Sequence, residues 1–289
     1  MKAAGWDAAA RHPQTPTHVT LQDVREIATE VWNELASNCS LPTDVNIHLA
    51  MDVSEKYVLA YTQRTLILVN NTWRPSFLFG YPGIDIEVHF NPDVPNGWYT
   101  GTDCRTGWRY DLRTVMRHEL LHGAGLSSSI RESNGAYQVG YRPLYSDACY
   151  PTFYDTQLTE NGIPVVHGCF YDAQSTNIYM AGRKIFVPDE YIAGSSFSHH
   201  DESGLFQWRL RPTQCETINA AEYDMLGGLG YDCGDAVYTQ LSAGQKINPR
   251  ASWGLALTIG IVLSILSRTS FSLRSAFLAA FLLSLFTHF

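Results

Sequence analysis

The chain has 289 residues, of which 45% are hydrophobic and 12% aromatic. This content is enough to bury a substantial core, either as one large domain or as two lobes around a cleft, and we favour two lobes. The formal net charge of -8 gives no electrostatic reason to bind a polyanion, because phosphate binding needs clustered Lys and Arg side chains. Nucleic acid is therefore not an expected partner.

The first part of the chain predicts an arm, one helix and several strands. Residues 1–19 are polar and contain proline, which indicates a loose arm. Thr20 can cap the run LQDVREIATEVWNELAS, whose apolar residues recur at helical spacing and predict an amphipathic helix. Residues 44–51 and 56–70 are rich in β-forming residues and predict two or three strands. Residues 84–90, IDIEVHF, alternate apolar and polar side chains, which predicts a half-buried strand.

The strongest signal is the stretch YDLRTVMRHELLHGAGLSS at residues 110–128. Within this stretch Asp111 can cap the start of a helix and Gly123 and Gly125 can end it, so the stretch predicts one short helix. His118 and His122 are four residues apart, so on a helix they share one face and both imidazoles can reach one metal ion, for which zinc is suited. Glu119 is the next residue after His118 on this helix, where it can take a proton from a metal-held water without binding the metal.

The second half of the chain is less regular. Residues 126–198 contain many aromatic residues, glycines and short apolar runs but no long periodic helix, which predicts an irregular, partly β insertion. The run AAEYDMLGGLGYDC at 220–233 predicts a short helix that ends at glycines. Residues 252–289 form two apolar runs of about fifteen residues each, shorter than the ~20 residues of a spanning helix. Small residues at 242–244 and a polar spacer also fit a removable GPI signal, so we expect a membrane-directing tail of either type.

The chain has six cysteines, scattered along the sequence without the CxxC spacing of a structural zinc site. An even, scattered set of cysteines predicts disulfides. Nearness in sequence favours the pairs Cys149–Cys169 and Cys215–Cys233, which leaves Cys39–Cys104. The alternative is a set of reduced, buried cysteines in a cytosolic protein. Glycosylation sequons at Asn38 and Asn70 fit a secretory route. The first 16 residues lack the apolar core of a signal peptide, so we expect a leader upstream of this sequence.

The predicted metal site needs a third ligand, because a catalytic zinc usually takes three protein ligands and keeps a fourth position for water. The short pattern HExxHxxGxxH has its glycine at Gly125, but Ser128 stands where its third histidine would be. A glutamate ligand about twenty residues downstream is also missing, since Glu132 is too near and Glu160 too far. The third ligand must therefore come from further along the chain.

The order of several motifs carries a resemblance to a known family. HELLHGAGL is followed by a long insertion, then by GSSFSHHDE and by a helix ending MLGGLGYDC. This order resembles the leishmanolysin-like branch of the metzincin zinc peptidases, which interrupt the short motif with an insertion before its last histidine. The resemblance runs from about residue 44 to residue 233 and includes IDIEVHFN, WYTGT, PTFYD and YIAGSSFSH.

The resemblance implies a role for individual residues. His118, His122 and His199 would hold one Zn²⁺ ion, and Glu119 would be the general base. His200 competes for the third position, and the order Ser-His-Asp at 198–201 favours His199. Asp201 and Glu202 could orient a ligand imidazole, although solvated acids are the more common outcome.

One feature departs from the family pattern. Metzincins carry a methionine in a tight turn beneath the zinc, downstream of the third ligand, whereas here that neighbourhood reads GLFQWRLRP. Phe206 is the candidate for its place, because Met225 lies too far along, in the predicted final helix. In a zinc endopeptidase, the strand at 84–90 could pair with an extended substrate backbone; otherwise it would be an edge strand covered by a loop.

Together these features predict an α+β fold, a metzincin-like two-lobed zinc peptidase with an irregular insertion and a hydrophobic tail. The expected divisions are an arm (1–19), an N-terminal catalytic lobe (20–125), an insertion with a C-terminal lobe (126–236), a linker (237–251) and the tail (252–289). The predicted function is a surface-anchored zinc metalloendopeptidase acting on proteins or peptides. The alternative is a catalytically silent surface adhesin or receptor that keeps a structural zinc. The missing methionine supports this alternative. Glu119 argues against it, because a structural zinc site needs no general base.

Overall fold

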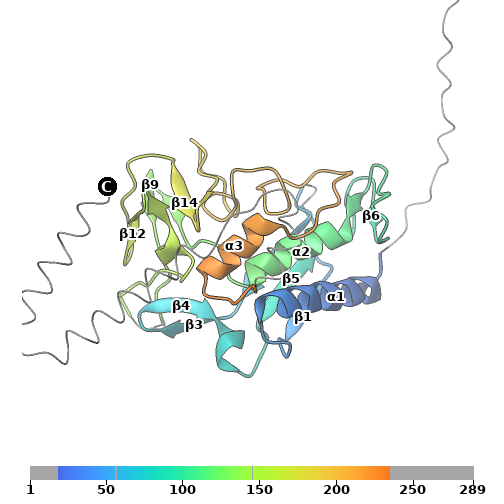
Figure 1. The fold of residues 1–289 in the computed structure, drawn as a ribbon, viewed down its shortest axis with the longest axis horizontal. Helices are drawn as coiled ribbons and strands as arrows, with labels where there is room; N and C mark the ends of the chain where they lie inside the picture. Colours follow the sequence, from blue (N-terminus) through green and yellow to red (C-terminus); the bar gives the residue numbers. More distant parts are fainter. Residues whose placement is uncertain (1–18, 56, 145, 235–289) are drawn as a thin grey trace, which may run out of the picture. The chain divides into compact units, whose positions relative to one another are not determined.

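A computed structural model describes residues 19–55, 57–144 and 146–234, which combine three α-helices with small β-sheets (Figure 1). The α+β class predicted from the sequence is therefore confirmed. All described residues belong to one compact unit, residues 1–238. Most of the predicted arm and all of the hydrophobic tail lie outside the described residues, and within these residues we find no helix that could cross a membrane.

Helix α1 (Leu21–Cys39) begins where the sequence predicts it. The Thr20 hydroxyl accepts a hydrogen bond from the Asp23 amide at 3.2 Å, and the Asp23 carboxylate accepts one from the Thr20 amide at 2.8 Å. This reciprocal pair satisfies amide groups that have no partner inside the helix. The apolar face of the helix, with Val24 and Leu35, is fully buried.

The sheet beside α1 has the strand order β1-β5-β2, from β1 (Ile47–Ala50), β5 (Ile86–Phe90) and β2 (Ala60–Arg64). β5 pairs in parallel with β1 and antiparallel with β2. The predicted alternation in residues 84–90 is confirmed, since Ile86, Val88 and Phe90 are fully buried. Its predicted position at a sheet edge is wrong, because both sides of β5 are occupied. The edge strand nearest the helix of His118 and His122 is β2.

Helix α2 (Leu112–Gly123) packs beside α1 and against the face of the sheet that carries the buried residues of β5 (Figure 1). Asp111 caps it as predicted, accepting a hydrogen bond from the Thr114 amide at 2.9 Å. Gly123 lets the helix end approach the sheet, since a Cβ there would lie 2.8 Å from the Ile86 side chain. Gly125, with a φ of 115°, then turns the chain away in a conformation that favours glycine.

The remaining segments are short and mostly β, as predicted for the insertion. A hairpin formed by β3 (Leu66–Val69) and β4 (Thr72–Pro75) leads to η1 (Ser76–Phe79), and β6 (Trp98–Tyr99) pairs with β7 (Tyr110–Asp111) before α2. The insertion contains β8 (Arg131–Ser133), β9 (Ala136–Gln138), η2 (Asp155–Gln157), β10 (Thr159–Glu160), β11 (Ile163–Pro164), β12 (Val166–His167), β13 (Phe170–Tyr171), β14 (Ile178–Met180) and β15 (Arg183–Lys184). Helix α3 (Ala220–Gly228) follows, where the sequence predicts it.

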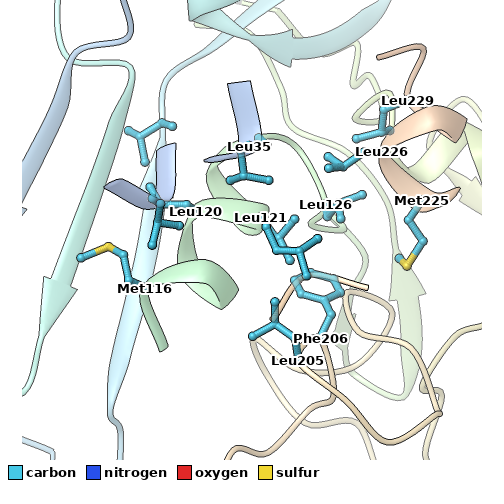
Figure 2. Packing of buried hydrophobic residues seen from close by; sticks show 14 of the residues in the cluster. Leu35, Met116, Leu120, Leu121, Leu126, Leu205, Phe206, Met225, Leu226 and Leu229 are labelled. Atoms are coloured by element: carbon cyan, nitrogen blue, oxygen red, sulfur yellow. The ribbon is translucent and has the colours of Figure 1, made fainter. Parts of the chain in front are cut away.

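One hydrophobic core joins the two halves of the described chain. Buried side chains from α1, α2 and α3 belong to the same cluster as residues of the insertion. Figure 2 shows its central part, where Leu121 of α2 lies close to Phe206 and Leu126. The predicted N-terminal and C-terminal lobes thus share their packing, and their separation into lobes stays a prediction.

Three disulfides are present, but two of the three predicted pairs are wrong. Cys149–Cys169 is confirmed, whereas the other bonds join Cys39 to Cys233 and Cys104 to Cys215. The error comes from ranking the pairs by nearness in sequence. Packing of α1 against α3 brings the end of α1 to the segment that follows α3, so cysteines 194 residues apart meet.

Candidate metal centre

Three histidines converge on one point, and they are the three that the sequence predicts. His118 and His122 lie one turn apart on α2, and His199 comes from the turn between β15 and α3. The Nε2 atom of His199 is 3.0 Å from that of His118 and 3.2 Å from that of His122. The three side chains are the group of described residues whose ligand atoms could hold one metal ion.

The opposite ring nitrogens determine which tautomer each histidine adopts. Each Nδ1 faces a backbone carbonyl oxygen: Leu205 at 2.9 Å from His118, Leu126 at 2.7 Å from His122, and Ser195 at 2.8 Å from His199. A carbonyl oxygen only accepts hydrogen bonds, so each Nδ1 carries the proton and each Nε2 presents a lone pair. Three lone pairs facing one another at these distances repel unless a cation lies between them.

The spacing of the Nε2 atoms also fits a metal ion. Zinc bound at ~2.05 Å to imidazole nitrogens in tetrahedral geometry would place those nitrogens about 3.3 Å apart. The observed separations of 3.0 and 3.2 Å are close to that value. The three histidines are therefore close enough together to bind one ion, and all of them line the same cleft.

Burial keeps the three imidazoles neutral. Desolvation lowers the pKa of His118 from 6.5 to about 4 and that of His199 to about 3, and it lowers the pKa of His122 well below its usual value. The carbonyl contacts of His118, His122 and His199 oppose these shifts because they favour the protonated ring. Neutral imidazole is the form that binds metals, so the site is ready for a cation at neutral pH.

Glu119 lies next to this group on α2 and is only 6% exposed. Desolvation raises the pKa of its carboxyl from 4.5 to about 7, while a hydrogen bond from Thr62 acts in the opposite direction. The Thr62 hydroxyl lies 2.8 Å from Glu119 Oε2. A carboxyl with a pKa near neutrality can both accept and release a proton under physiological conditions.

A cleft of about 710 Å³ opens in front of these side chains. Glu119 and the three histidines line it together with residues 60–62 of β2, residues 193–195 and residues 208–210. A cavity of this size accommodates a ligand of several hundred daltons. The three histidines and the buried carboxyl therefore line space that a small ligand could enter.

His200, the competing third ligand, points elsewhere. Its Nε2 faces Glu222 Oε1 at 3.2 Å, and both side chains are buried, at 1% and 0% exposure. Glu222 also accepts hydrogen bonds from the amides of Phe206, at 3.1 Å, and Asn219, at 2.8 Å. The packing therefore separates the two neighbouring histidines, with His199 in the cluster and His200 in a hydrogen-bonded pair behind it.

The acids that follow His200 do not orient the ligands. Asp201 pairs with Lys184 at 3.1 Å and Glu202 with Arg183 at 3.7 Å, and both acids are exposed.

Three residues that help to shape the site were not predicted from the sequence: Thr62, Glu222 and Asp155. Asp155 accepts hydrogen bonds from residues 128, 129 and 152, and so holds the chain that leaves α2. No local pattern marked these three residues, because each contacts a segment that is distant in sequence.

Ser128 stands where the short motif would have its third histidine, and the returning chain lies beside it. The Ser128 amide donates a hydrogen bond to Ser198 Oγ at 3.1 Å. Phe206 is fully buried, and its ring centroid lies 5.2, 4.8 and 5.2 Å from the rings of His118, His122 and His199. An aromatic ring thus packs against all three histidines at the base of the site.

Comparison with known proteins assigns no relative: no protein-family model, no curated protein and no solved structure matches the chain. The site itself shows a buried group of three histidines that could hold a metal ion, beside a buried carboxyl and an open cleft.

Proposed function

We propose that this protein is a zinc-dependent peptidase of the leishmanolysin-like metzincin type. The observation that carries the proposal is the triangle of Nε2 lone pairs with the Glu119 carboxyl beside it in the same cleft. The order of the sequence motifs supports the choice of family. A division of this chain into two lobes around the cleft is part of the same proposal.

Zinc is the metal that we propose, and His118, His122 and His199 would hold it. Three neutral imidazoles are a common protein ligand set for catalytic zinc. When bound, zinc would supply Lewis-acid chemistry, polarising a carbonyl group and lowering the pKa of a water molecule.

The chain's own residues would carry out the proton transfers. His118, His122 and His199 hold the cation, and their Nδ1 contacts to carbonyl oxygens keep the rings oriented. Glu119 takes a proton from the attacking water, whose oxygen forms a bond to the peptide carbonyl carbon. The C–N bond breaks, and Glu119 delivers the proton to the departing nitrogen. No residue of the protein becomes covalently bonded to the substrate.

A peptide is the substrate class that the surroundings favour. β2 is an edge strand of its sheet, and residues 60–62 of that strand line the cleft. An edge strand presents backbone amide and carbonyl groups with which an extended peptide can pair. The cleft therefore offers a place for a polypeptide segment next to Glu119.

The proposed setting is the cell surface. Three disulfides are compatible with an extracellular location. Of the two sequons, Asn70 is exposed, whereas the Asn38 amide is engaged with the Tyr223 hydroxyl at 2.9 Å. The apolar segment 252–289, outside the described residues, would provide the membrane attachment, either as a spanning segment or as a GPI signal.

The test combines metal content with peptide cleavage. Purified protein should contain about one zinc per chain and cleave an unfolded protein substrate, whereas Glu119→Ala should retain zinc and lose cleavage at least about 100-fold. Glu132→Gln, which changes an exposed glutamate outside the cleft, serves as the matched control and should behave like the wild type. Zinc-loaded wild type no faster than Glu119→Ala would instead favour a silent adhesin or receptor with a structural zinc.

A further inference from the structure

Strand β2 contacts the metal helix through two alternate side chains. Thr62 and Arg64 point toward α2, whereas Gln63 between them is exposed. Because side chains alternate along a strand, residues two apart lie on one face and about 7 Å apart. This spacing lets one strand contact α2 at two places, one at Glu119 and one at the helix end.

The first contact is made by Thr62. Its Oγ1 lies 2.8 Å from Glu119 Oε2 and 3.0 Å from the Glu119 carbonyl oxygen. Among the described residues, no other side chain hydrogen-bonds to the Glu119 carboxyl, and none donates to its Oε1. Threonine is β-branched, which restricts its χ1 torsion and so the position of Oγ1. The hydroxyl has one proton for these two acceptors, of which the carboxylate oxygen is the nearer.

The second contact is made by Arg64. Its guanidinium donates to the carbonyl oxygen of His122 at 3.2 Å and to that of Ser127 at 2.8 Å. These carbonyls lie where α2 ends and the chain turns away, and that of His122 also accepts a hydrogen bond from the Gly125 amide at 3.0 Å. Thr62 and Arg64 together therefore join β2 to α2 at two places, one of them at Glu119.

From this arrangement we infer that Thr62 is a positioning residue for Glu119. Its hydrogen bond holds Oε2 and so leaves Oε1 to take the proton of the attacking water. Without it, the carboxyl of a long side chain could rotate within the open cleft, and misplacement of a catalytic group by about 1 Å can cost about 100-fold in rate. The inference rests on the proposed peptidase function, because it assigns a role to the base of that reaction.

The test compares Thr62→Val, which keeps the shape and removes the hydroxyl, with Thr62→Ser, which keeps the hydroxyl. All variants are full-length and zinc-loaded. We expect Thr62→Val to lower kcat about 10- to 100-fold with KM and zinc content near those of the wild type, and Thr62→Ser to retain most of kcat. Gln63→Val, on the exposed face of the same strand, is the control and should keep wild-type kinetics.

Crystal structures of the zinc-loaded variants give a second readout that does not depend on activity. The Glu119 carboxyl should keep its position in Thr62→Ser and adopt another rotamer in Thr62→Val. Wild-type kcat in Thr62→Val, or an unmoved Glu119 carboxyl in its structure, would overturn the positioning role. If zinc-loaded wild type proves no faster than Glu119→Ala, the peptidase proposal fails by itself, and the rotamer of Glu119 still decides whether Thr62 holds it.

Discussion

The buried carboxyl of Glu119 should make the stability of the metal-free protein depend on pH, and Glu119→Gln should remove that dependence. Burial raises the pKa of this carboxyl from 4.5 to about 7. Between these values the folded protein holds a proton that the unfolded chain releases. The stabilising contribution of this carboxyl to the unfolding free energy is therefore fully present below pH 4.5 and is lost as the pH rises through about 7.

The size of the effect follows from the same pKa values. One pKa unit corresponds to about 1.4 kcal/mol, so the rise from 4.5 to about 7 amounts to about 3 kcal/mol of unfolding free energy at alkaline pH. Glutamine has nearly the same shape and carries no charge at any pH. Glu119→Gln should thus match the wild type near pH 4 and exceed its stability by about 3 kcal/mol above pH 8.

The assay is urea unfolding of chelator-treated protein at a series of pH values from 4 to 9, with disulfides intact. The buried histidines are present in both proteins, so their contribution cancels in the difference. Glu132→Gln, at an exposed position, is the control and should differ little from the wild type in unfolding free energy. A constant difference between Glu119→Gln and wild type over the whole range would refute the reasoning.

Three further predictions concern the third histidine of the site, the ring of Phe206 and the disulfide pairs. His199→Ala should abolish zinc binding, whereas His200→Ala should keep about one zinc per chain. His200→Ala should also lower the unfolding free energy by about 2 kcal/mol, because the Glu222 carboxyl loses a buried partner. Elemental analysis measures the zinc and thermal unfolding the stability, and equal loss of zinc in both variants would contradict the assignment. Phe206→Ala should cost about 3–5 kcal/mol as a core cavity, and Phe206→Met less than about 1.5 kcal/mol, measured by urea unfolding. Equal costs would mean that the ring does not fill the base of the site. Digestion without reduction should release cross-linked peptides that contain Cys39 with Cys233, Cys104 with Cys215, and Cys149 with Cys169; Cys215 joined to Cys233 would contradict the fold.

Prediction from the sequence succeeded where the relevant contacts lie within one or two turns of chain. Helix α1 starts at Thr20 because its cap and its partner Asp23 are three residues apart. The buried alternation of β5 was also visible, since it depends on a period of two residues. The position of β5 within its sheet was not visible, because strand order depends on pairing with β1 and β2, which lie at least twenty residues earlier.

The sequence by itself determined the metal helix: the spacing of His118 and His122 puts both imidazoles on one face, and Glu119 follows from the same period. The order of the motifs favoured His199 over its neighbour His200, but only the tertiary structure shows which of the two turns toward them. That choice depends on where Leu205, Ser195 and Glu222 offer hydrogen-bond partners. The same holds for Thr62 and for two of the three disulfides. Contacts between distant segments are set by the packing of the whole core, and no local pattern of residues encodes them.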